Sequence, residues 1–248
     1  MKKLVKILAI VMVVALSATM LYACGGKEED NVLTMGTNAA FPPYEYYEGE
    51  TIVGIDAEVG ALIAEKLGME FEILDMDFNG IISAVQNGVV DIGMAGMTVR
   101  EDRLEHVNFS TTYAKGVQVV IVKEGSDIAT LDDLAGKLIG VQEATTGDAY
   151  ASEDYGEESV KRYTNGAAAV AALQSGIVNA VIIDNEPAKA FVEANEGLTI
   201  LETAYADEDY AIAVAKENTE LLEKINQALA ELTADGSIDA IVNKYIPA

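Results

Sequence analysis

A weak internal duplication is the feature of this sequence that most restricts its fold. Residues 84–92 (AVQNGVVDI) align without gaps on residues 172–180 (ALQSGIVNA). Each copy is typical of a helix end, followed by a glycine just past the C-cap and an apolar run that enters a buried strand. The pairs Asn79-Gly80 and Asn165-Gly166 mark matching helix starts. One helix-to-strand unit in each half predicts two similar α/β lobes.

The same alternation of strands and helices continues along the chain. Asp56 is expected to cap a helix that ends at Gly68, and Ser237 to cap a last helix that follows Gly236 and reaches Tyr245. Short apolar runs predict further strands at residues 32–37, 70–74, 116–122, 137–141 and 210–214. Strands that alternate with helices predict mainly parallel sheets, whose ligand sites lie at the carboxyl ends of the strands.

The first 23 residues are typical of a secretion signal. Three lysines precede residues 7–23, an uncharged and mostly apolar run that is short for a bilayer-spanning helix. The run stops at LYAC, which resembles a bacterial lipobox, where cleavage occurs before a lipid-modified cysteine. We therefore predict that residues 1–23 are removed, that Cys24 carries diacylglycerol at the outer face of a bacterial membrane, and that residues 24–30 form a flexible tether. The alternative is an uncleaved anchor helix with an incidental cysteine.

Charge and cysteine content exclude several kinds of partner. Removing residues 1–23 takes away three of the 16 basic residues and no acidic ones, which leaves 13 against 41, a formal charge of −28. Such a chain is not expected to bind nucleic acid. Cys24 is the single cysteine and His106 the single histidine, and the acidic residues 207–209 lack the spacing of an EF-hand. We therefore expect no disulfide, no metal and no cofactor.

Four stretches resemble the polar amino-acid-binding proteins of ABC importers. They are residues 36–45 (GTNAAFPPYE), 54–56 (GID), 76–103 (beginning MDFNGII and containing AGMT) and 180–184 (AVIID). The likeness covers about residues 32–246. It implies the two-lobed Venus flytrap fold, the type 2 periplasmic binding protein, with two hinge crossings. Lobe 1 would combine residues 31–113 with 211–248, and lobe 2 would be residues 114–210.

The resemblance also implies a function. Such a receptor captures a free amino acid between its lobes and delivers it to a permease and ATPase complex in the membrane, without catalysis. We expect it to be a monomer. The rival interpretation is an enzyme, because secreted cyclohexadienyl dehydratases share the fold, but the sequence shows no convincing catalytic pair.

Two helix N-termini are predicted to hold the ligand carboxylate. Residues 98–101 (TVRE) look like a capping box just after a buried strand, and Arg103, one turn further, can add a bidentate fork. The alternative for Arg103 is a solvated helix arginine. In lobe 2, Thr146 resembles the family's second carboxylate donor, although threonine is also a common helix cap.

Asp184 is predicted to hold the ligand ammonium. It ends the strand of the second repeat, roughly where Gly96 stands in the first, and an aspartate has this role in the family; capping the next helix is its alternative. Phe41 and Phe78 would sandwich the ligand side chain, or else belong to the core. The predicted binding set is Asn38, Phe41, Phe78, Ala95, Gly96, Thr98, Arg103, Gln142, Thr146 and Asp184.

Asn38 bears on specificity. Family members that prefer lysine, arginine or histidine commonly have an aspartate at this position, so an amide favours a neutral polar ligand such as glutamine. Gln142 could add a second amide. Glu45 and Glu143 could restore a negative charge, so a cationic amino acid (arginine, lysine or histidine) remains the alternative ligand.

We predict that Cys24 is the lipidated first residue of the mature protein. Changing Cys24→Ser should abolish both lipid attachment and cleavage, because the thiol is the site of the lipid. Mass spectrometry of the membrane fraction measures both. A wild-type mature mass without diacylglycerol would contradict the prediction.

Overall fold

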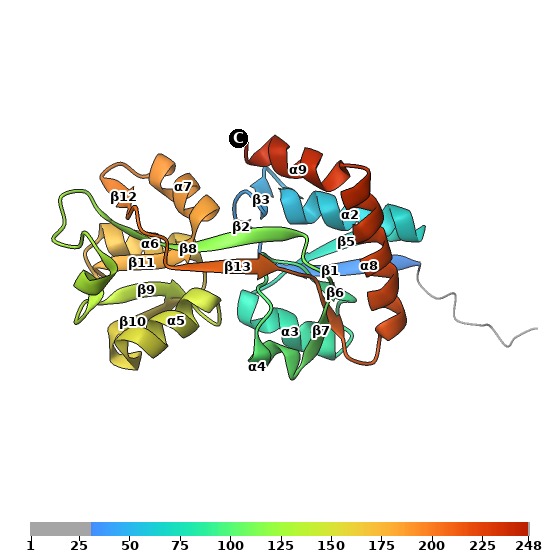
Figure 1. The fold of residues 1–248 in the computed structure, drawn as a ribbon, viewed down its shortest axis with the longest axis horizontal. Helices are drawn as coiled ribbons and strands as arrows, with labels where there is room; N and C mark the ends of the chain where they lie inside the picture. The colour runs from blue at the N-terminus through green and yellow to red at the C-terminus, as the bar shows by residue number, and fades with distance from the viewer. Residues whose placement is uncertain (1–30, 248) are drawn as a thin grey trace, which may run out of the picture. The chain divides into compact units, whose positions relative to one another are not determined.

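The computed structural model describes residues 31–247, so the predicted signal peptide, Cys24 and the tether lie outside the described residues. From Leu33 onward the chain forms one compact unit. That unit has two α/β lobes (Figure 1). Within the described residues, none of the helices combines the length and the apolar character that crossing a bilayer requires. The two-lobed α/β fold expected from the repeat is therefore confirmed.

The first lobe is built on a five-stranded sheet. Its strands are β1 (Val32–Thr37), β5 (Glu70–Asp75), β6 (Ile92–Gly93), β7 (Val107–Phe109) and β14 (Ala213–Ala215), in the order β5-β1-β6-β14-β7. A hairpin sheet adds β2 (Ala40–Phe41), β3 (Glu45–Glu48) and β4 (Thr51–Val53). The helices packed here are α2 (Ile55–Leu67), α3 (Phe78–Gln86), α4 (Glu101–Leu104), α8 (Thr219–Ala234) and α9 (Ser237–Tyr245).

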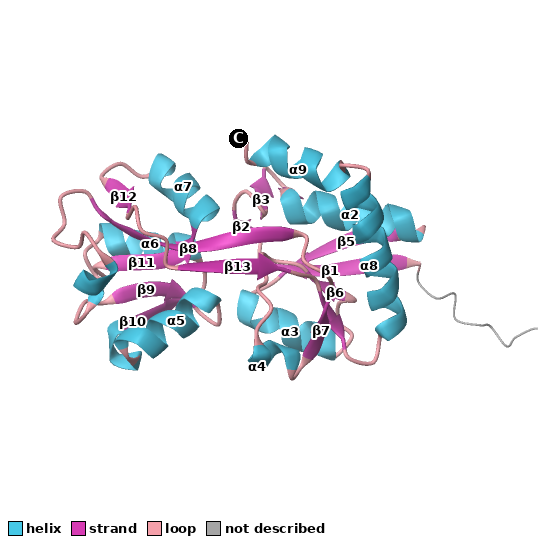
Figure 2. Cartoon of the chain, viewed as in Figure 1, coloured by secondary structure: helices cyan, strands magenta, loops and turns pink. Residues whose placement is uncertain are grey.

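The second lobe is built on a six-stranded sheet, and helices flank it as they flank the first sheet (Figure 2). Its strands are β8 (Ala114–Lys123), β9 (Ile139–Gln142), β10 (Val160–Tyr163), β11 (Ala180–Asp184), β12 (Leu198–Ile200) and β13 (Ala206–Tyr210). The order is β10-β9-β11-β8-β12, and β13 pairs with β8. Its helical elements are α5 (Thr146–Tyr155), α6 (Gly166–Gln174), α7 (Asn185–Ala194) and the 3₁₀ turns η1 (Leu131–Leu134) and η2 (Glu157–Ser159).

Both sheets are mixed, so the expectation of mainly parallel sheets was too simple. The strands joined by helix crossovers do pair in parallel, as β1 does with β6 and β9 does with β10 and β11. Antiparallel pairs arise where the chain passes between the lobes, because β8 and β13 run in opposite directions and β14 returns against β6 and β7. A strand that brings the chain back into a sheet must run against its neighbour unless a crossover intervenes.

The internal repeat is a structural repeat. In the first copy α3 ends at Gln86 and is followed by Gly88 with a φ of 66°; in the second, α6 ends at Gln174 and is followed by Gly176 with a φ of 75°. Glycine adopts this left-handed conformation without the steric cost of a Cβ atom. Both copies then enter buried strands, β6 and β11.

The chain crosses between the sheets along two paired strands. β8 and β13 are antiparallel, with Lys115 opposite Asp209. A single strand over residues 210–214 was expected, but β13 ends at Tyr210 and β14 starts at Ala213. The break occurs because Ala211 N donates to the Met97 carbonyl and Ile212 N to Ser110 Oγ, so these residues bond outside the ladder of either strand. The lobe limits 31–113 plus 211–248 and 114–210 remain a proposal.

Two of the expected helix caps are not caps. The helix α2 starts from Gly54, and the buried Asp56 side chain instead accepts hydrogen bonds from Gly96 N at 2.8 Å and from the Tyr113 hydroxyl. The helix α9 starts from Gly236, with a φ of 80°, and Ser237 is its first residue. In both places a glycine makes the sharp turn, so no side-chain cap is needed to start the helix.

Candidate ligand-binding site

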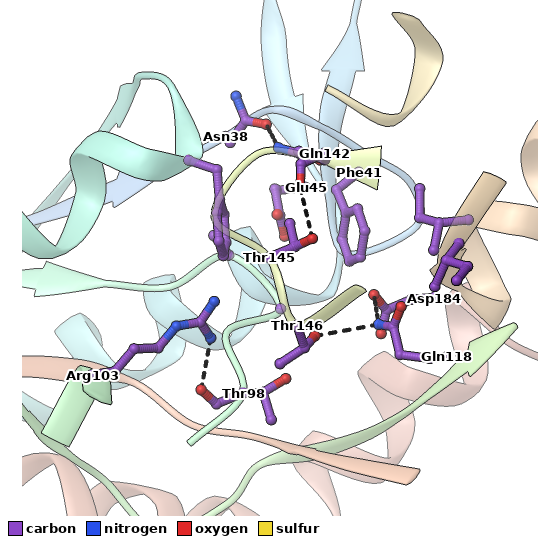
Figure 3. Close-up of a pocket in the computed structure, with 15 residues that line it drawn as sticks. Asn38, Phe41, Glu45, Thr98, Arg103, Gln118, Gln142, Thr145, Thr146 and Asp184 are labelled. Carbon is purple, nitrogen blue, oxygen red and sulfur yellow. Dashed lines mark hydrogen bonds between the residues drawn. The ribbon is translucent and has the colours of Figure 1, made fainter. Parts of the chain in front are cut away.

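The ten residues predicted from the sequence line one pocket. It encloses about 440 Å³ of empty space, counting the part open to solvent, which is in the range of small-molecule sites. Five further residues line it that the predicted set did not contain: Glu45, Gln118, Thr145, Ile182 and Ile183. The lining residues come from elements of both lobes, and Figure 3 shows Arg103 and Asp184 on opposite sides of the pocket.

Phe41 and Phe78 form part of the apolar wall. The Phe41 ring lies so close to Gly96 that a Cβ atom added there would be 2.8 Å from Phe41 Cε1, and the φ of Gly96 is 53°. Glycine is therefore required at position 96 for both space and conformation. The Phe78 ring lies under the guanidinium of Arg103, with 5.4 Å between Arg103 Cζ and the ring centroid. Such a contact adds a cation–π attraction that holds the guanidinium in place.

Arg103 is buried, with only 3% of its surface exposed, so it is not a solvated helix arginine. Its Nη1 donates to the Thr98 carbonyl at 2.8 Å and its Nη2 to the Ala144 carbonyl at 3.0 Å. Burial lowers the pKa of the Arg103 guanidinium to about 10, so the group stays charged at neutral pH. Several N–H donors remain on the guanidinium beyond these two bonds, and Arg103 lines the pocket, so they could bind the carboxylate of a ligand there.

The prediction of a capping box at residues 98–101 is wrong. The helix α4 starts only at Glu101, its N-cap is Arg100 without a side-chain cap, and it has four residues. Thr98 instead forms an isolated β-bridge with Tyr210. Because the bridge keeps the backbone extended at Thr98, the chain cannot turn into a helix there. Thr98 and Arg103 still line the pocket, but a helix dipole from α4 contributes little over so short a length.

The second helix N-terminus exists. Thr145 is the N-cap of α5 and its hydroxyl accepts from Asp148 N at 3.2 Å. Thr146, the first residue of the helix, is therefore not the capping threonine, and its hydroxyl lies 3.5 Å from Gln118 Nε2 at the pocket. The first turn of a helix has backbone N–H groups without intrahelical partners, which suits a carboxylate.

Asp184 is the N-cap of α7 by position, but its side chain makes no capping bond. The carboxylate instead accepts from Gln118 Nε2 at 2.7 Å and from the Tyr210 hydroxyl. Burial, followed by the charge of Glu208, raises the pKa of the Asp184 carboxyl well above its usual range. A cation placed beside this carboxylate would favour its charged form.

Gln118 is the most important residue that the sequence analysis missed. It is 1% exposed in the middle of β8, and its Nε2 donates to both Asp184 and Glu208. A signal was available, because an amide inside the apolar run at residues 116–122 is costly to bury unless it is hydrogen-bonded. Glu45, also buried, had been considered only as a source of charge; its pKa is raised well above the usual range by burial and by Asp56.

Four hydrogen bonds link residues 142–145 of the second lobe to residues of the first lobe beside the pocket. Gln142 Nε2 donates to Asn38 Oδ1 at 2.9 Å (Figure 3). Arg103 donates to the Ala144 carbonyl as described above, and the two remaining bonds are Asn79 Nδ2 to Glu143 Oε2 at 3.2 Å and Arg100 Nη1 to the Thr145 carbonyl at 3.0 Å. The lobes are therefore closed on one another across the pocket.

Within residues 31–247, no group of three or more His, Cys, Asp or Glu side chains is arranged to hold a metal ion. The pocket combines one guanidinium, one helix N-terminus, buried carboxylates and aromatic walls. These features suit a small ligand that carries both a carboxylate and an ammonium group.

Comparison with known proteins agrees with this chemistry. Residues 33–248 match the family described as bacterial extracellular solute-binding proteins, family 3, and the chain belongs to this family. It is a substrate-binding protein and not an enzyme, as the sequence analysis expected.

The relatives include arginine-binding proteins. The arginine-binding extracellular protein ArtP of Bacillus subtilis (strain 168) is 32% identical over 91% of this chain and 92% of its own length. Among solved structures, an ancestral arginine-binding protein bound to glutamine is 41% identical, with a TM-score of 0.84, over 88% of this chain and 99% of that one. The arginine-, lysine-, histidine-binding protein ArtJ of Geobacillus stearothermophilus is 32% identical, with a TM-score of 0.83, over 87% and 95%.

The two neighbouring threonines at the start of α5 should differ in their effect on stability. Thr145→Ala removes the N-cap bond and should lower the free energy of unfolding by about 1 kcal/mol. Thr146→Ala removes no cap and should lower it by less. Urea unfolding of both variants without ligand measures the difference, and an equal loss in the two would contradict the assignment of the cap to Thr145.

Proposed function

We propose that this protein is the extracytoplasmic receptor of an ABC importer for a polar amino acid, with arginine as the favoured ligand. One observation supports the amino-acid class above all: Arg103 and Asp184 line the same pocket from different lobes. The carboxylate of an amino acid would meet Arg103 and the N-terminus of α5, and its ammonium would meet Asp184. A ligand that contacts both lobes would stabilise the closed form, which is how hinged receptors respond to ligand.

The hydrogen bonds that Asn38 already makes determine what it can still offer a ligand. Asn38 Nδ2 donates to the Met76 carbonyl at 2.9 Å, and Asn38 Oδ1 accepts from Gln142. Asn38 can still offer a ligand the second N–H of its amide and the second lone pair of its carbonyl oxygen. Asn38 therefore does not by itself favour a donating side chain over an accepting one, and the choice depends on the other groups of the pocket.

Arginine supplies more donors than glutamine does. Its guanidinium has five N–H groups, against two on the amide of glutamine. Two carboxyl groups line the pocket, Glu45 and Asp184, against the single guanidinium of Arg103. A zwitterion offers one ammonium to these two carboxyl groups, so a ligand side chain that also donates leaves fewer acceptors without a partner. The arginine-binding relatives support the same preference, and we place glutamine second because a similar protein has been solved with it bound.

The position of the receptor in the cell forms part of the proposal. The family is extracellular, and the LYAC stretch before residue 25 supports a lipid anchor on Cys24. A tether of residues 24–30 would keep a monomeric receptor beside its permease and ATPase complex. The large negative charge would keep the folded part soluble and away from anionic lipid.

A ligand screen tests the function and the specificity together. We expect thermal unfolding to shift upward with arginine, because a ligand at 100 times its dissociation constant stabilises a fold by about 2.7 kcal/mol. Glutamine should give a smaller shift than arginine at equal concentration. The screen should cover the twenty amino acids and cystine, followed by calorimetry on the hits. No response to any of them would contradict the function, and a glutamine affinity above that of arginine would contradict only the specificity.

Arg103 is expected to anchor the ligand carboxylate. Arg103→Ala removes charge-assisted hydrogen bonds, each worth about 1.5–3 kcal/mol, so the dissociation constant should rise at least about tenfold. Arg162→Ala is the matched control, since Arg162 forms its ion pairs with Asp148 and Glu157 outside the pocket lining. Calorimetric titration compares the variants, and an unchanged affinity in folded Arg103→Ala would remove this residue from the site.

A further inference from the structure

Two buried carboxylates, Asp184 and Glu208, share one amide group behind the pocket. Gln118 Nε2 donates to Asp184 Oδ2 at 2.7 Å and to Glu208 Oε2 at 3.0 Å, so the two carboxylates are immediate neighbours. Glu208 is 5% exposed, and its other oxygen, Oε1, has no hydrogen-bond partner. Its neighbours in sequence, Asp207 and Asp209, are exposed on the opposite face of β13.

The surroundings do not neutralise this pair. The titratable groups that face it are the Tyr210 hydroxyl on β13, Tyr150 on α5, Tyr44 and Glu45 from the hairpin segment, and Arg103 on α4. On α7, Glu186 is paired with Lys189. Arg103 is the one cation among the groups facing the pair, and two of its donors are already bonded to carbonyl groups of Thr98 and Ala144. Two like charges in a buried site disfavour each other, so one of them tends to take up a proton.

We propose that Asp184 and Glu208 hold one proton between them when no ligand is bound, and that the ammonium group of the ligand takes the place of this proton. The inference rests on the proposed function, since it requires an amino acid at Asp184. The proton leaves to solvent as the ammonium arrives. The pair thereby loses one positive charge, and the ammonium group of the ligand brings one. The local charge is therefore the same before and after binding. Glu208 is a positioning residue here, acting on the ligand through Asp184 and Gln118.

The raised pKa of Asp184, caused by burial and then by the charge of Glu208, supports this arrangement. Because the free protein holds the extra proton and the complex does not, binding must release it, and affinity must rise with pH. Linkage limits the slope to about tenfold per pH unit for one proton. The dependence begins above the pKa of the pair in the complex and ends where the free pair has lost its proton.

Calorimetry with arginine on the folded wild-type protein is the direct test. At each pH between about 5 and about 8, the titration is repeated in two buffers that differ in ionisation enthalpy, which gives the number of protons exchanged. We expect release of up to about one proton per ligand, with an affinity that falls as the pH is lowered. Binding without proton release anywhere in this range would overturn the inference and leave the receptor function standing. Absence of binding by any amino acid would overturn both.

Glu208→Gln identifies the source of the proton. This variant keeps the shape and the hydrogen bonding of the side chain but removes the like charge, so proton release should fall toward zero near neutral pH and the affinity should become flat there. Asp209→Asn is the matched control, with the same chemical change one residue along the strand on the exposed face, and it should keep the wild-type slope. Unchanged proton release in Glu208→Gln would assign the proton to another group, such as Glu45, and overturn the inference. The wild-type proton count needs no variant and stands even if Glu208→Gln fails to fold.

Discussion

The antiparallel pairing of β8 with β13 is the contact on which the rest of the structure depends. Both strands belong to the six-stranded sheet, and the chain enters β8 from β7 and leaves β13 for β14 in the five-stranded sheet. The register of the pair sets Glu208 opposite Gly116. The absence of a side chain at Gly116 leaves room for Tyr210, because a Cβ atom there would lie 2.2 Å from the Tyr210 hydroxyl and 2.8 Å from Asp184 Oδ1. Residues two apart on a strand share a face, so Glu208 and Tyr210 reach the same side of the sheet. The strands that carry the chain between the sheets, β8 and β13, therefore also position the polar groups at this end of the pocket.

Local signals explain what could be predicted from the sequence. The helix ends before Gly88 and Gly176 were predictable because a left-handed glycine followed by an apolar run needs only neighbouring residues. The motif residues of the pocket followed from the family resemblance. The predictions that failed depend on residues distant in the sequence. Thr98 looked like a helix cap but pairs with Tyr210, which lies more than a hundred positions further along the chain. Glu208 was considered only as part of the acidic residues 207–209, since only the pairing with β8 shows which face of the strand it occupies.

Asp56 has a supporting role that the pocket residues rely on. Its carboxylate accepts from Gly96 N and from the Tyr113 hydroxyl, so it ties the start of α2 to the segment that carries Gly96 and to the chain just before the first crossing. Burial raises the pKa of Asp56 to about 6, which means that its charge is maintained at neutral pH only with the help of these bonds. A buried carboxylate that bonds to two other segments holds Gly96, a pocket residue, in a defined position.

The loop at residues 142–145 stabilises the closed arrangement of the two lobes. Ala144 has a φ of 64°, a conformation that costs a residue with a side chain roughly 1–2 kcal/mol, and its carbonyl accepts from Arg103. Gln142 likewise bonds to Asn38. These are the same polar groups that a bound amino acid would use. The loop therefore supplies hydrogen bonds of the protein's own that hold the closed arrangement, in addition to those that a ligand would make. Part of the free energy of closing is thus provided by the protein itself, whichever ligand occupies the pocket.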